Sequence, residues 1–328
     1  MNNFKKVGFS ALAGSLVATS AMAGEVTVSG AAGMYLEHIN GSGANSGKSF
    51  SMDNQLTFSG SGELDNGLNV SISFVLDQGD DGLTATNNAT TAQSTSPFDS
   101  HSVTVSSDTF GSVTMHGEGM SSASGALDST PSGNIWDAFQ AAANEPEAAP
   151  GGANGLSYAF PSLMDGLALT ASYTPSAGNP SSSTAFGVVY TGVEWLTLTY
   201  ASGDDKANAT SEADHTVMAA KYAYGPITVA VMQSEYDDAV ASGDQTTDAY
   251  SVAYTVSDGL SISYGSEELE FGVQSSSQVA AEFERIKVSY TAGGMTLTAS
   301  SATGDNIDYS TTATKDQEVW ALGASFAF

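Results

Sequence analysis

Apolar and polar residues alternate with a period of two along most of the chain. In VTVSGAAGMYLE at 26–37, the apolar residues Val26, Val28, Ala32, Met34 and Leu36 share one parity. The same pattern recurs in FSMDNQLTF at 50–58, LNVSISFVLD at 68–77 and DAYSVAYTVS at 248–257. Such alternation is typical of β-strands with one apolar and one polar face. Helical spacing is almost absent, so the chain is predicted to be all-β.

Short turns separate the alternating runs. They are LDNG at 64–67, MDG at 164–166, YGP at 224–226, SDG at 257–259 and AGG at 292–294. Asx-Gly and Gly-Gly dipeptides in such positions are hairpin signals. With the turns near 110–111 and 193–194, strands are predicted to restart at 68, 113, 167, 195, 227, 260 and 295.

The opposite connections are longer, polar and acidic. Tight turns on one side and long loops on the other predict a closed antiparallel transmembrane β-barrel of about sixteen strands. A β-sandwich or a parallel β-helix is the alternative. Several runs alternate for about ten residues, whereas sandwich strands have roughly 5 to 6, and this length favours the barrel.

The two ends of the chain fit the same prediction. Residues 1–23 begin MNNFKK, continue through a weakly apolar stretch and end Ala21-Met22-Ala23, which is typical of a cleaved secretory signal. Residues 24–328 are then expected to form a single barrel domain. The chain ends on the alternating stretch VWALGASFAF, and this last strand is expected to pair with the first, from Val26 onward, to close the barrel.

Composition excludes several function classes. The chain has 8 basic and 36 acidic residues, a net charge of −28, and no cysteine. Such a surface repels nucleic acid, whose binding relies on Lys and Arg, and thiolate metal sites are excluded. The part after the signal has no apolar run of 18 residues or more, so no transmembrane helix is expected. No spacing of Ser, His and acid residues indicates an enzyme.

Several motifs, in order and spacing, carry a family resemblance. They are the Ala-x-Ala signal followed by GEVTVSG, the turn ELDNGL, TFGSVTMHGEGM before a long insertion, GLSYAFPSLMDGL, and the terminal Phe328. Over its whole mature length the chain resembles the sixteen-stranded general diffusion porins, closest to the alphaproteobacterial type.

The resemblance implies a homotrimer in the outer membrane, in contact with lipid and lipopolysaccharide. It implies passive diffusion of small hydrophilic solutes and ions, and insertion by an assembly machinery that reads the terminal aromatic Phe328. By position, the third external loop is Glu118 to Ala153, which the family folds into the lumen to narrow the pore. The second loop, 77–97, would reach toward a neighbouring subunit.

One departure from the family concerns charge. General porins usually place a cluster of arginines opposite an acidic third loop. This chain has a single arginine, Arg285, and its early strands offer only Asp53 and no basic residue. The positive side of the constriction is therefore not located by the resemblance.

Acidic residues of the inserted loop are the main candidates for the constriction. The loop has no Lys or Arg, and its acidic residues are Glu118, Asp128, Asp137, Glu145 and Glu147. Inside a lumen they would favour cations, as carboxylate rings do in cation channels. The alternative is that most of them only solvate a polar loop. The function predicted is a pore with a modest cation preference.

Three further residues are candidates by parity. In ERIKVSY, Arg285 and Lys287 alternate with apolar residues, and a charge facing lipid costs roughly 2–4 kcal/mol at the midplane, so both are expected in the lumen. The alternative for Arg285 is a salt bridge with Glu282 or Glu284. His116 has the polar parity just before Glu118 and is expected near the constriction.

Two questions stay open in the sequence. Clusters such as DQGDD, with Asp77, Asp80 and Asp81, offer oxygen ligands for calcium but match no ordered binding loop; solvated loops explain them equally well, and no other cofactor is expected. The alternatives to a general pore are a structural or adhesive surface barrel, whose loops matter more than its lumen, and a substrate-selective outer-membrane channel.

Overall fold

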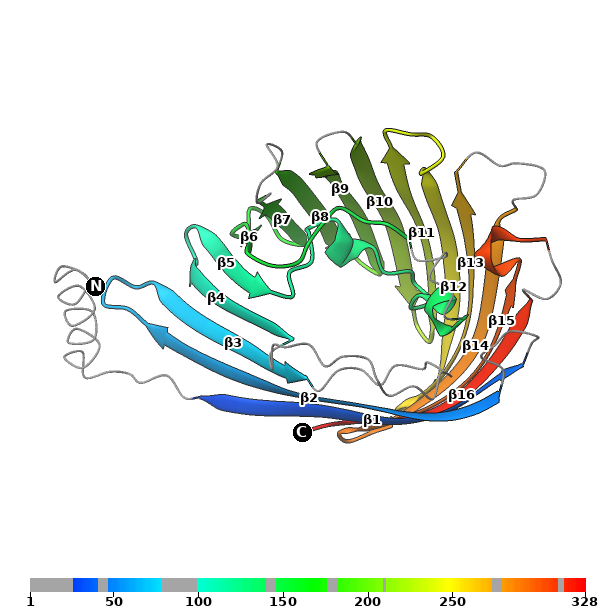
Figure 1. Cartoon of the computed structure of the whole chain (residues 1–328). Coiled ribbons are helices and arrows are strands. Elements are labelled where there is room, and N and C mark those ends of the chain that lie inside the picture. Colours follow the sequence, from blue (N-terminus) through cyan, green and yellow to red (C-terminus); the bar gives the residue numbers. More distant parts are fainter. Residues whose placement is uncertain are drawn as a thin grey trace, which may run out of the picture.

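The computed structural model describes residues 26–40, 47–77, 99–139, 146–175, 182–208, 211–272, 279–311 and 316–328. Sixteen antiparallel strands follow one another in sequence order and close into a single barrel (Figure 1). The strands are β1 (Thr27–Asn40), β2 (Gly47–Glu63), β3 (Asn69–Asp77), β4 (Ser100–Ser107), β5 (Gly111–Glu118), β6 (Gly155–Ala159), β7 (Leu167–Thr174), β8 (Ser183–Val193), β9 (Leu196–Asn208), β10 (Ser211–Tyr224), β11 (Ile227–Asp238), β12 (Gln245–Ser257), β13 (Leu260–Phe271), β14 (Ala281–Ala292), β15 (Met295–Asp305) and β16 (Gln317–Ala327). The predicted fold class is confirmed.

Helical structure is limited to short 3-10 turns in the described residues. These are η1 (Gly125–Leu127), η2 (Ile135–Phe139) and η4 (Ile307–Tyr309). No helix among the described residues is long and apolar enough to cross a membrane.

Side chains alternate between the outer face and the lumen. On β14, Ile286, Val288 and Tyr290 are exposed on the outer face, while Arg285 and Lys287 lie on the opposite, inner face. An apolar outer surface suits lipid, and the inner parity is left free for polar and small residues.

Tight turns join the hairpins where the sequence pattern places them. The predicted restarts lie within two residues of the observed strand starts. Gly67 and Gly259 have φ values of +79° each, a conformation that side-chain-bearing residues rarely adopt. The turn glycines therefore fix where each strand begins again.

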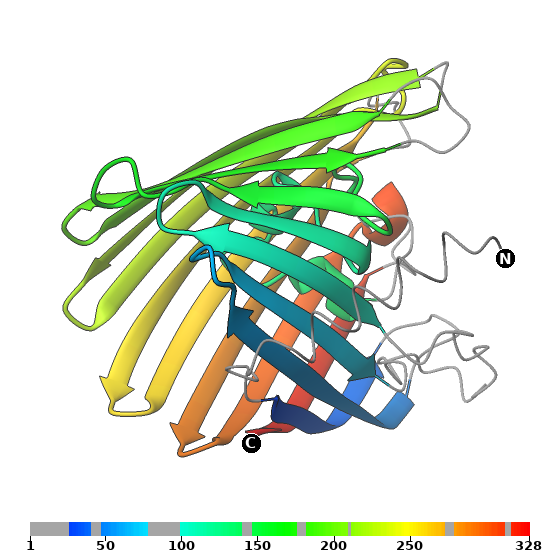
Figure 2. The ribbon, with the colours of Figure 1, turned by 90° about the vertical axis from the view of Figure 1, so that its left-hand side faces the viewer.

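The wall is not equally high all round. β4 and β5 have 8 residues each and β6 has 5, whereas β10 has 14 and β12 has 13. The shorter strands lie side by side on one flank of the barrel (Figure 2).

The first and last strands form the seam of the barrel. Their register runs from Ala31 opposite Ala327 to Asn40 opposite Glu318. Phe328 extends this ladder, since its N–H donates to the Gly30 carbonyl at 3.0 Å and its carbonyl accepts from the Gly30 N–H at 2.7 Å. The Phe328 side chain is 74% exposed on the outer face and lies over Gly30, where an added Cβ would come 2.6 Å from the ring Cζ.

A row of carboxylates crosses four strands on the outer face, near the end that carries the long connections. Asp248 lies opposite Glu268, Glu268 opposite Glu282, and Glu282 opposite Asp305. All four residues are exposed. Like charges directly opposite one another are destabilising, so this part of the wall carries a repulsion that salt screens.

The predicted signal at 1–23 lies outside the described residues. The same holds for the loop at 77–97 beyond its first residue, Asp77, which ends β3. Cleavage at Ala23 and contact of the second loop with a neighbouring subunit stay predictions.

The seam generates a stability prediction. Gly30→Ala places a methyl group against the exposed Phe328 ring, which must move aside, so this variant should unfold at a lower temperature than the parent. Deleting Phe328 removes the last pair of the ladder and should reduce the amount of protein assembled in the membrane. Thermal unfolding can be followed by the electrophoretic shift of the refolded barrel.

The matched control is Gly60→Ala. An added Cβ at Gly60 comes no closer than 3.5 Å to a neighbour, the Ile72 Cγ1 atom, so this variant should unfold like the parent. Equal unfolding temperatures for the two alanine variants, together with normal assembly of the shortened chain, would show that Phe328 is not part of the closure.

Candidate functional site

The described parts of the inserted segment between β5 and β6, residues 119–139 and 146–154, lie inside the barrel. Figure 1 shows η1 and η2 within the ring of strands. The two arms of the segment are tied to each other: Met120 and Gly152 exchange backbone hydrogen bonds of 2.9 and 2.6 Å, and the Ser122 hydroxyl donates to the Ala149 carbonyl at 2.6 Å. The segment is therefore a closed loop that rests on the inner wall.

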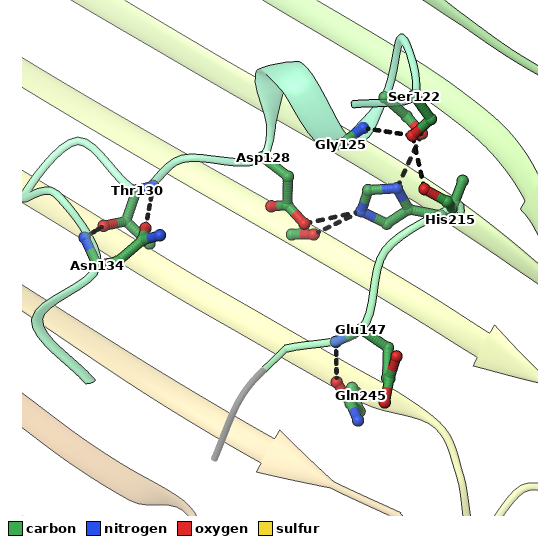
Figure 3. A network of polar contacts seen from close by, with 11 residues as sticks. Ser122, Gly125, Asp128, Thr130, Asn134, Glu147, His215 and Gln245 are labelled. Atoms are coloured by element: carbon green, nitrogen blue, oxygen red, sulfur yellow. Dashed lines mark hydrogen bonds and ion pairs between the residues drawn. The ribbon is translucent and has the colours of Figure 1, made fainter. Parts of the chain in front are cut away.

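The first attachment to the wall is His215 on β10 (Figure 3). Its Nε2 lies 2.9 Å from Asp128 Oδ2 and 3.2 Å from the Ser234 hydroxyl, and its Nδ1 lies 3.0 Å from the Ser124 hydroxyl. In the neutral ring, Nε2–H donates to the carboxylate and Nδ1 accepts from Ser124. His215 and Ser124 are fully buried, and the Asp128 side chain is 9% exposed. This network fixes the η1 half of the segment.

The second attachment is Glu267 on β13, which is 1% exposed. One carboxylate oxygen accepts from the Thr130 hydroxyl and the other accepts from the Trp136 N–H at 3.1 Å. Thr130 and Asn134 also bond each other reciprocally, at 3.0 and 2.7 Å, and close the turn between them (Figure 3). Glu267 therefore holds the start of η2, where the backbone N–H groups have no helical partners.

The third attachment is Arg285 on β14. Its guanidinium donates to the carbonyls of Ser132 and Gly133 in the inserted segment. Glu282 and Glu284 lie on the outer face, where Glu284 accepts a 2.8 Å bond from the Tyr264 hydroxyl. The alternative of a salt bridge from Arg285 to one of them is wrong, because neighbouring residues of a strand point to opposite faces.

An apolar cluster completes the hold on the segment. Ile135 and Phe139 of η2 are 0% and 3% exposed and pack with wall residues of β13 to β16 and β1. The other buried members of the cluster are Ile39, Leu269, Ala281, Phe283, Ala302, Ile307, Tyr309 and Val319. Burial raises the pKa of Tyr309 to about 12, so this phenol stays neutral. Each large side chain buried here stabilises the packing by roughly 1.5–3 kcal/mol.

Small residues on the wall make room for the segment. An added Cβ at Gly203 would lie 2.8 Å from the Ser124 hydroxyl, and one at Gly265 would lie 2.5 Å from Ser132 Cβ. Buried alanines occupy further inner positions beneath the segment: Ala185, Ala201, Ala213, Ala249, Ala281 and Ala302. Larger residues there would push the segment farther into the pore.

The inner wall of β2 to β6 has a different character. Its inner positions on β2 to β6 carry mostly hydroxyl side chains: Ser49, Ser51, Thr57, Ser59, Ser71, Ser73, Ser102, Thr104, Ser106, Ser112, Thr114 and Ser157. Asp53 accepts a 2.8 Å bond from Tyr35, and His116 lies 2.9 Å from the Ser157 hydroxyl. The expectation that the early strands carry no basic residue is wrong, because β2 contains Lys48, which lies opposite His38 on the outer face. In the described parts of β1 to β7, no Lys or Arg has the inner parity.

Inward-facing cations occur instead on the other side of the barrel. They are Lys221 on β10 and Arg285 and Lys287 on β14. Arg285 lies under the inserted segment, so the positive charge is on the segment's own side of the pore. This arrangement differs from an arginine cluster that faces an acidic third loop.

The acidic residues of the segment fall into different environments. Asp128 is engaged with His215, Asp137 and Glu147 are exposed, and Glu118 is half-buried at the end of β5. Glu147 is held through its backbone N–H, which donates to Gln245 Oε1 at 2.7 Å (Figure 3). Glu145 lies outside the described residues.

The calcium question stays a prediction. Asp77 ends β3, and Asp80 and Asp81 lie outside the described residues. Within the described ranges, no group of three or more His, Asp or Glu side chains is placed to hold a metal ion.

Three residues of the site were not predicted from the sequence. Parity in the stretch ADHTV puts His215 on the inner face with Ala213 and Val217, and parity likewise puts Glu267 and Tyr35 inside. The partners of His215 in the segment, Asp128 and Ser124, are 87 and 91 positions away. Those of Glu267, Trp136 and Thr130, are 131 and 137 positions away. Periodicity gives the face but not the partner.

Comparisons with known proteins agree with this geometry. A family described as Gram-negative porin matches residues 9–283. Among solved structures, an anion-selective porin from Comamonas acidovorans has a TM-score of 0.67 at 17% identity, covering 93% of this chain and 99% of its own. A multiple-substitution variant of the Rh. blastica porin has a TM-score of 0.65 at 14% identity, covering 93% and 100%. The Vibrio cholerae outer membrane protein OmpT, with its loop L8 deleted, has a TM-score of 0.63 at 16% identity and the same coverage as the Rh. blastica variant. Curated protein sequences give no match.

The Glu267 attachment generates a prediction about the segment. Glu267→Gln keeps the side-chain shape but replaces one acceptor oxygen with an NH₂ group, so Thr130 or Trp136 loses its acceptor. A buried donor without a partner costs about 1–3 kcal/mol. The segment should then leave the wall more often, and single-channel recordings in planar bilayers should show several-fold more brief current steps.

Glu268→Gln is the matched control, because Glu268 is the next residue on the strand and faces outward. Its current noise should equal that of the parent. Quiet, parent-like currents from a correctly assembled Glu267→Gln channel would mean that Glu267 does not hold the segment.

Proposed function

The chain belongs to the Gram-negative porin family, and we propose that it forms a trimeric, water-filled pore that passes small cations in preference to anions. As a member of this family it is an outer-membrane channel for diffusion and not an enzyme. The proposal adds the cation preference, the trimer and the residues that act on the ions.

The distribution of charge in the lumen is the observation that supports the cation preference. Ions passing the inserted segment meet the exposed carboxylates Asp137 and Glu147 on one side and Asp53 on the hydroxyl-lined wall. Of the three inward-facing cations, Arg285 donates to backbone carbonyls under the segment, and both Arg285 and Lys287 are half-buried. Only Lys221 is exposed, so the carboxylates outnumber the exposed positive charge. Carboxylates that line a pore raise the local concentration of cations.

Diffusion through such a pore needs no coupling to an energy source. Serine and threonine hydroxyls both donate and accept hydrogen bonds, so the wall of β2 to β6 can replace part of the water around a hydrophilic solute. The fixed carboxylates then bias which ions enter, and the inserted segment limits their size.

Reversal potentials test the cation preference. With a potassium chloride gradient across a planar bilayer, the potential at zero current should have the cation-selective sign. Asp137→Asn removes an exposed carboxylate of the segment and should shift that potential measurably toward zero. The shift should be larger at 0.01 M than at 1 M salt, because the screening length falls from about 30 Å to about 3 Å.

Glu284→Gln removes the same charge from the outer face and serves as the control, which should leave the reversal potential unchanged. An anion-selective sign for the parent channel would overturn the proposed selectivity while leaving the family membership intact.

The trimer is supported by the distribution of aromatic residues on the outer face. Tyr and Trp side chains mark the lipid interfaces of membrane barrels. The exposed Tyr and Trp residues of the described chain all lie from β7 onward: Tyr173, Trp195, Tyr200, Tyr222, Tyr224, Tyr250, Tyr254, Tyr290 and Trp320. On β1 to β5 the large apolar residues exposed on the outer face are aliphatic, Met or Phe, such as Met34, Phe50 and Met115. We infer that this sector faces other copies of the chain.

A single label distinguishes a subunit contact from lipid. The chain has no cysteine, so Met115→Cys on β5 and Val231→Cys on β11 each give a unique site for a nitroxide spin label. Both residues are exposed on the outer face of one barrel, at 57% and 51%. In reconstituted protein, the label at 231 should be several-fold more accessible to lipid-dissolved oxygen than the label at 115. Equal accessibility at the two positions would count against the interface.

A further inference from the structure

We propose that Tyr35 and Asp53 form a binding site on the pore wall for solutes that carry a substituted ammonium group. The proposal rests on the pore function above and names a class of solute for it. The two residues come from adjacent strands, β1 and β2, and both are half-buried on the inner face. The Tyr35 hydroxyl donates to Asp53 Oδ2 at 2.8 Å.

Two glycines allow the Tyr35 ring to lie flat on the wall. An added Cβ at Gly33 would lie 2.6 Å from Tyr35 Cε2, on one edge of the ring. An added Cβ at Gly323 on β16 would lie 2.9 Å from Cδ1 and 3.1 Å from Cε1, on the other edge. Since both edges rest on inward-facing glycine positions, one face of the ring lies against the wall and the other faces the lumen.

The carboxylate of Asp53 is held beside this open ring face. It lies over Gly33 as well, close to where a side chain at that position would be, and the bond from the Tyr35 hydroxyl fixes its orientation. An ammonium group placed over the ring would meet the negative face of the aromatic system and an anionic oxygen at once. Recognition of alkylated ammonium groups by aromatic faces follows this chemistry.

The surrounding charges favour a cation here. No Lys or Arg in the described parts of β1, β2 and β16 has the inner parity, since Lys48 lies on the outer face. An anionic solute would meet only repulsion at this position.

A second tyrosine and carboxylate pair shows what the glycines contribute. The Tyr236 hydroxyl donates to Asp205 Oδ2 at 2.9 Å on the inner face of β11 and β9. Tyr236 is only 8% exposed, so its ring has no face open to a solute. The bond alone does not make a site, whereas the flat, open ring of Tyr35 does.

The test uses choline as the probe and the whole trimer in planar bilayers. Choline chloride added to a potassium chloride solution should reduce the potassium current of the parent channel in a saturable way. Tyr35→Leu should raise the half-blocking concentration roughly 2- to 5-fold, the range of an exposed cation–π contact, while the reversal potential in potassium chloride should keep its cation-selective sign. Asp53→Asn should weaken the block and also reduce the cation preference.

Control variants separate the site from general effects. Tyr35→Phe keeps the ring on the two glycines and should retain most of the block, and Tyr236→Phe should block like the parent. An unchanged half-blocking concentration in Tyr35→Leu would overturn the site while the reversal potential still reports on the proposed function. If glucose also blocked the parent channel and this block were lost in Tyr35→Leu, the position would be assigned to carbohydrate. That result would also overturn the proposal.

Discussion

Hydrogen bonding of the backbone in lipid is the constraint from which the rest of this structure follows. A strand that spans a membrane must pair on both edges, because the hydrocarbon offers no partner for N–H and C=O groups. The chain meets this demand by pairing β1 with β16, and Phe328 adds the last pair with Gly30. Closure then assigns every side chain to one of two faces. The outer face must suit lipid, so all chemistry that acts on solutes is confined to the inner parity and to the segment that lies against it.

The inserted segment covers one part of the inner face and leaves the other part open to the lumen. From β8 to β15 its alanines and glycines accept the inserted segment, and His215, Glu267 and Arg285 are among the polar wall residues that hold it. Burying such groups is costly unless their hydrogen bonds are satisfied. Apart from the Ser234 hydroxyl on β11, their partners are hydroxyls, a carboxylate and backbone groups of the segment itself. The wall residues are therefore satisfied only when the segment occupies this one position, and the polar contacts select that position more than they add stability.

A sequence pattern predicts only contacts between residues that are close together along the chain, and this limit decides which features of the fold and site could be predicted. Period-two alternation and turn glycines are local, so the sixteen strands, their starts and the lumenal parity of Arg285 and Lys287 could be predicted. Contacts between Asp128 and His215, or between Thr130 and Glu267, join residues 87 and 137 positions apart. No local pattern encodes these distances, so Asp128 was expected to face ions when its charge is in fact engaged with the wall. The one local pattern that indicates a covered inner surface is the run of alanines on the inner parity of β8 to β15.

In this chain different residues hold the segment and charge the wall of the pore, whereas an arginine cluster opposite the loop would do both. Arg285 bonds backbone carbonyls of the segment rather than a carboxylate across the gap. It can hold the segment without contributing a positive wall to the pore. The hydroxyl-lined wall, with Asp53, is then free to differ from the family pattern without loss of the constriction. The carboxylates of Asp137 and Glu147 are exposed, and the described contacts do not use them to anchor the segment. Glu147 is anchored through its backbone N–H instead. Selectivity can therefore change at these positions while the architecture of the pore stays the same.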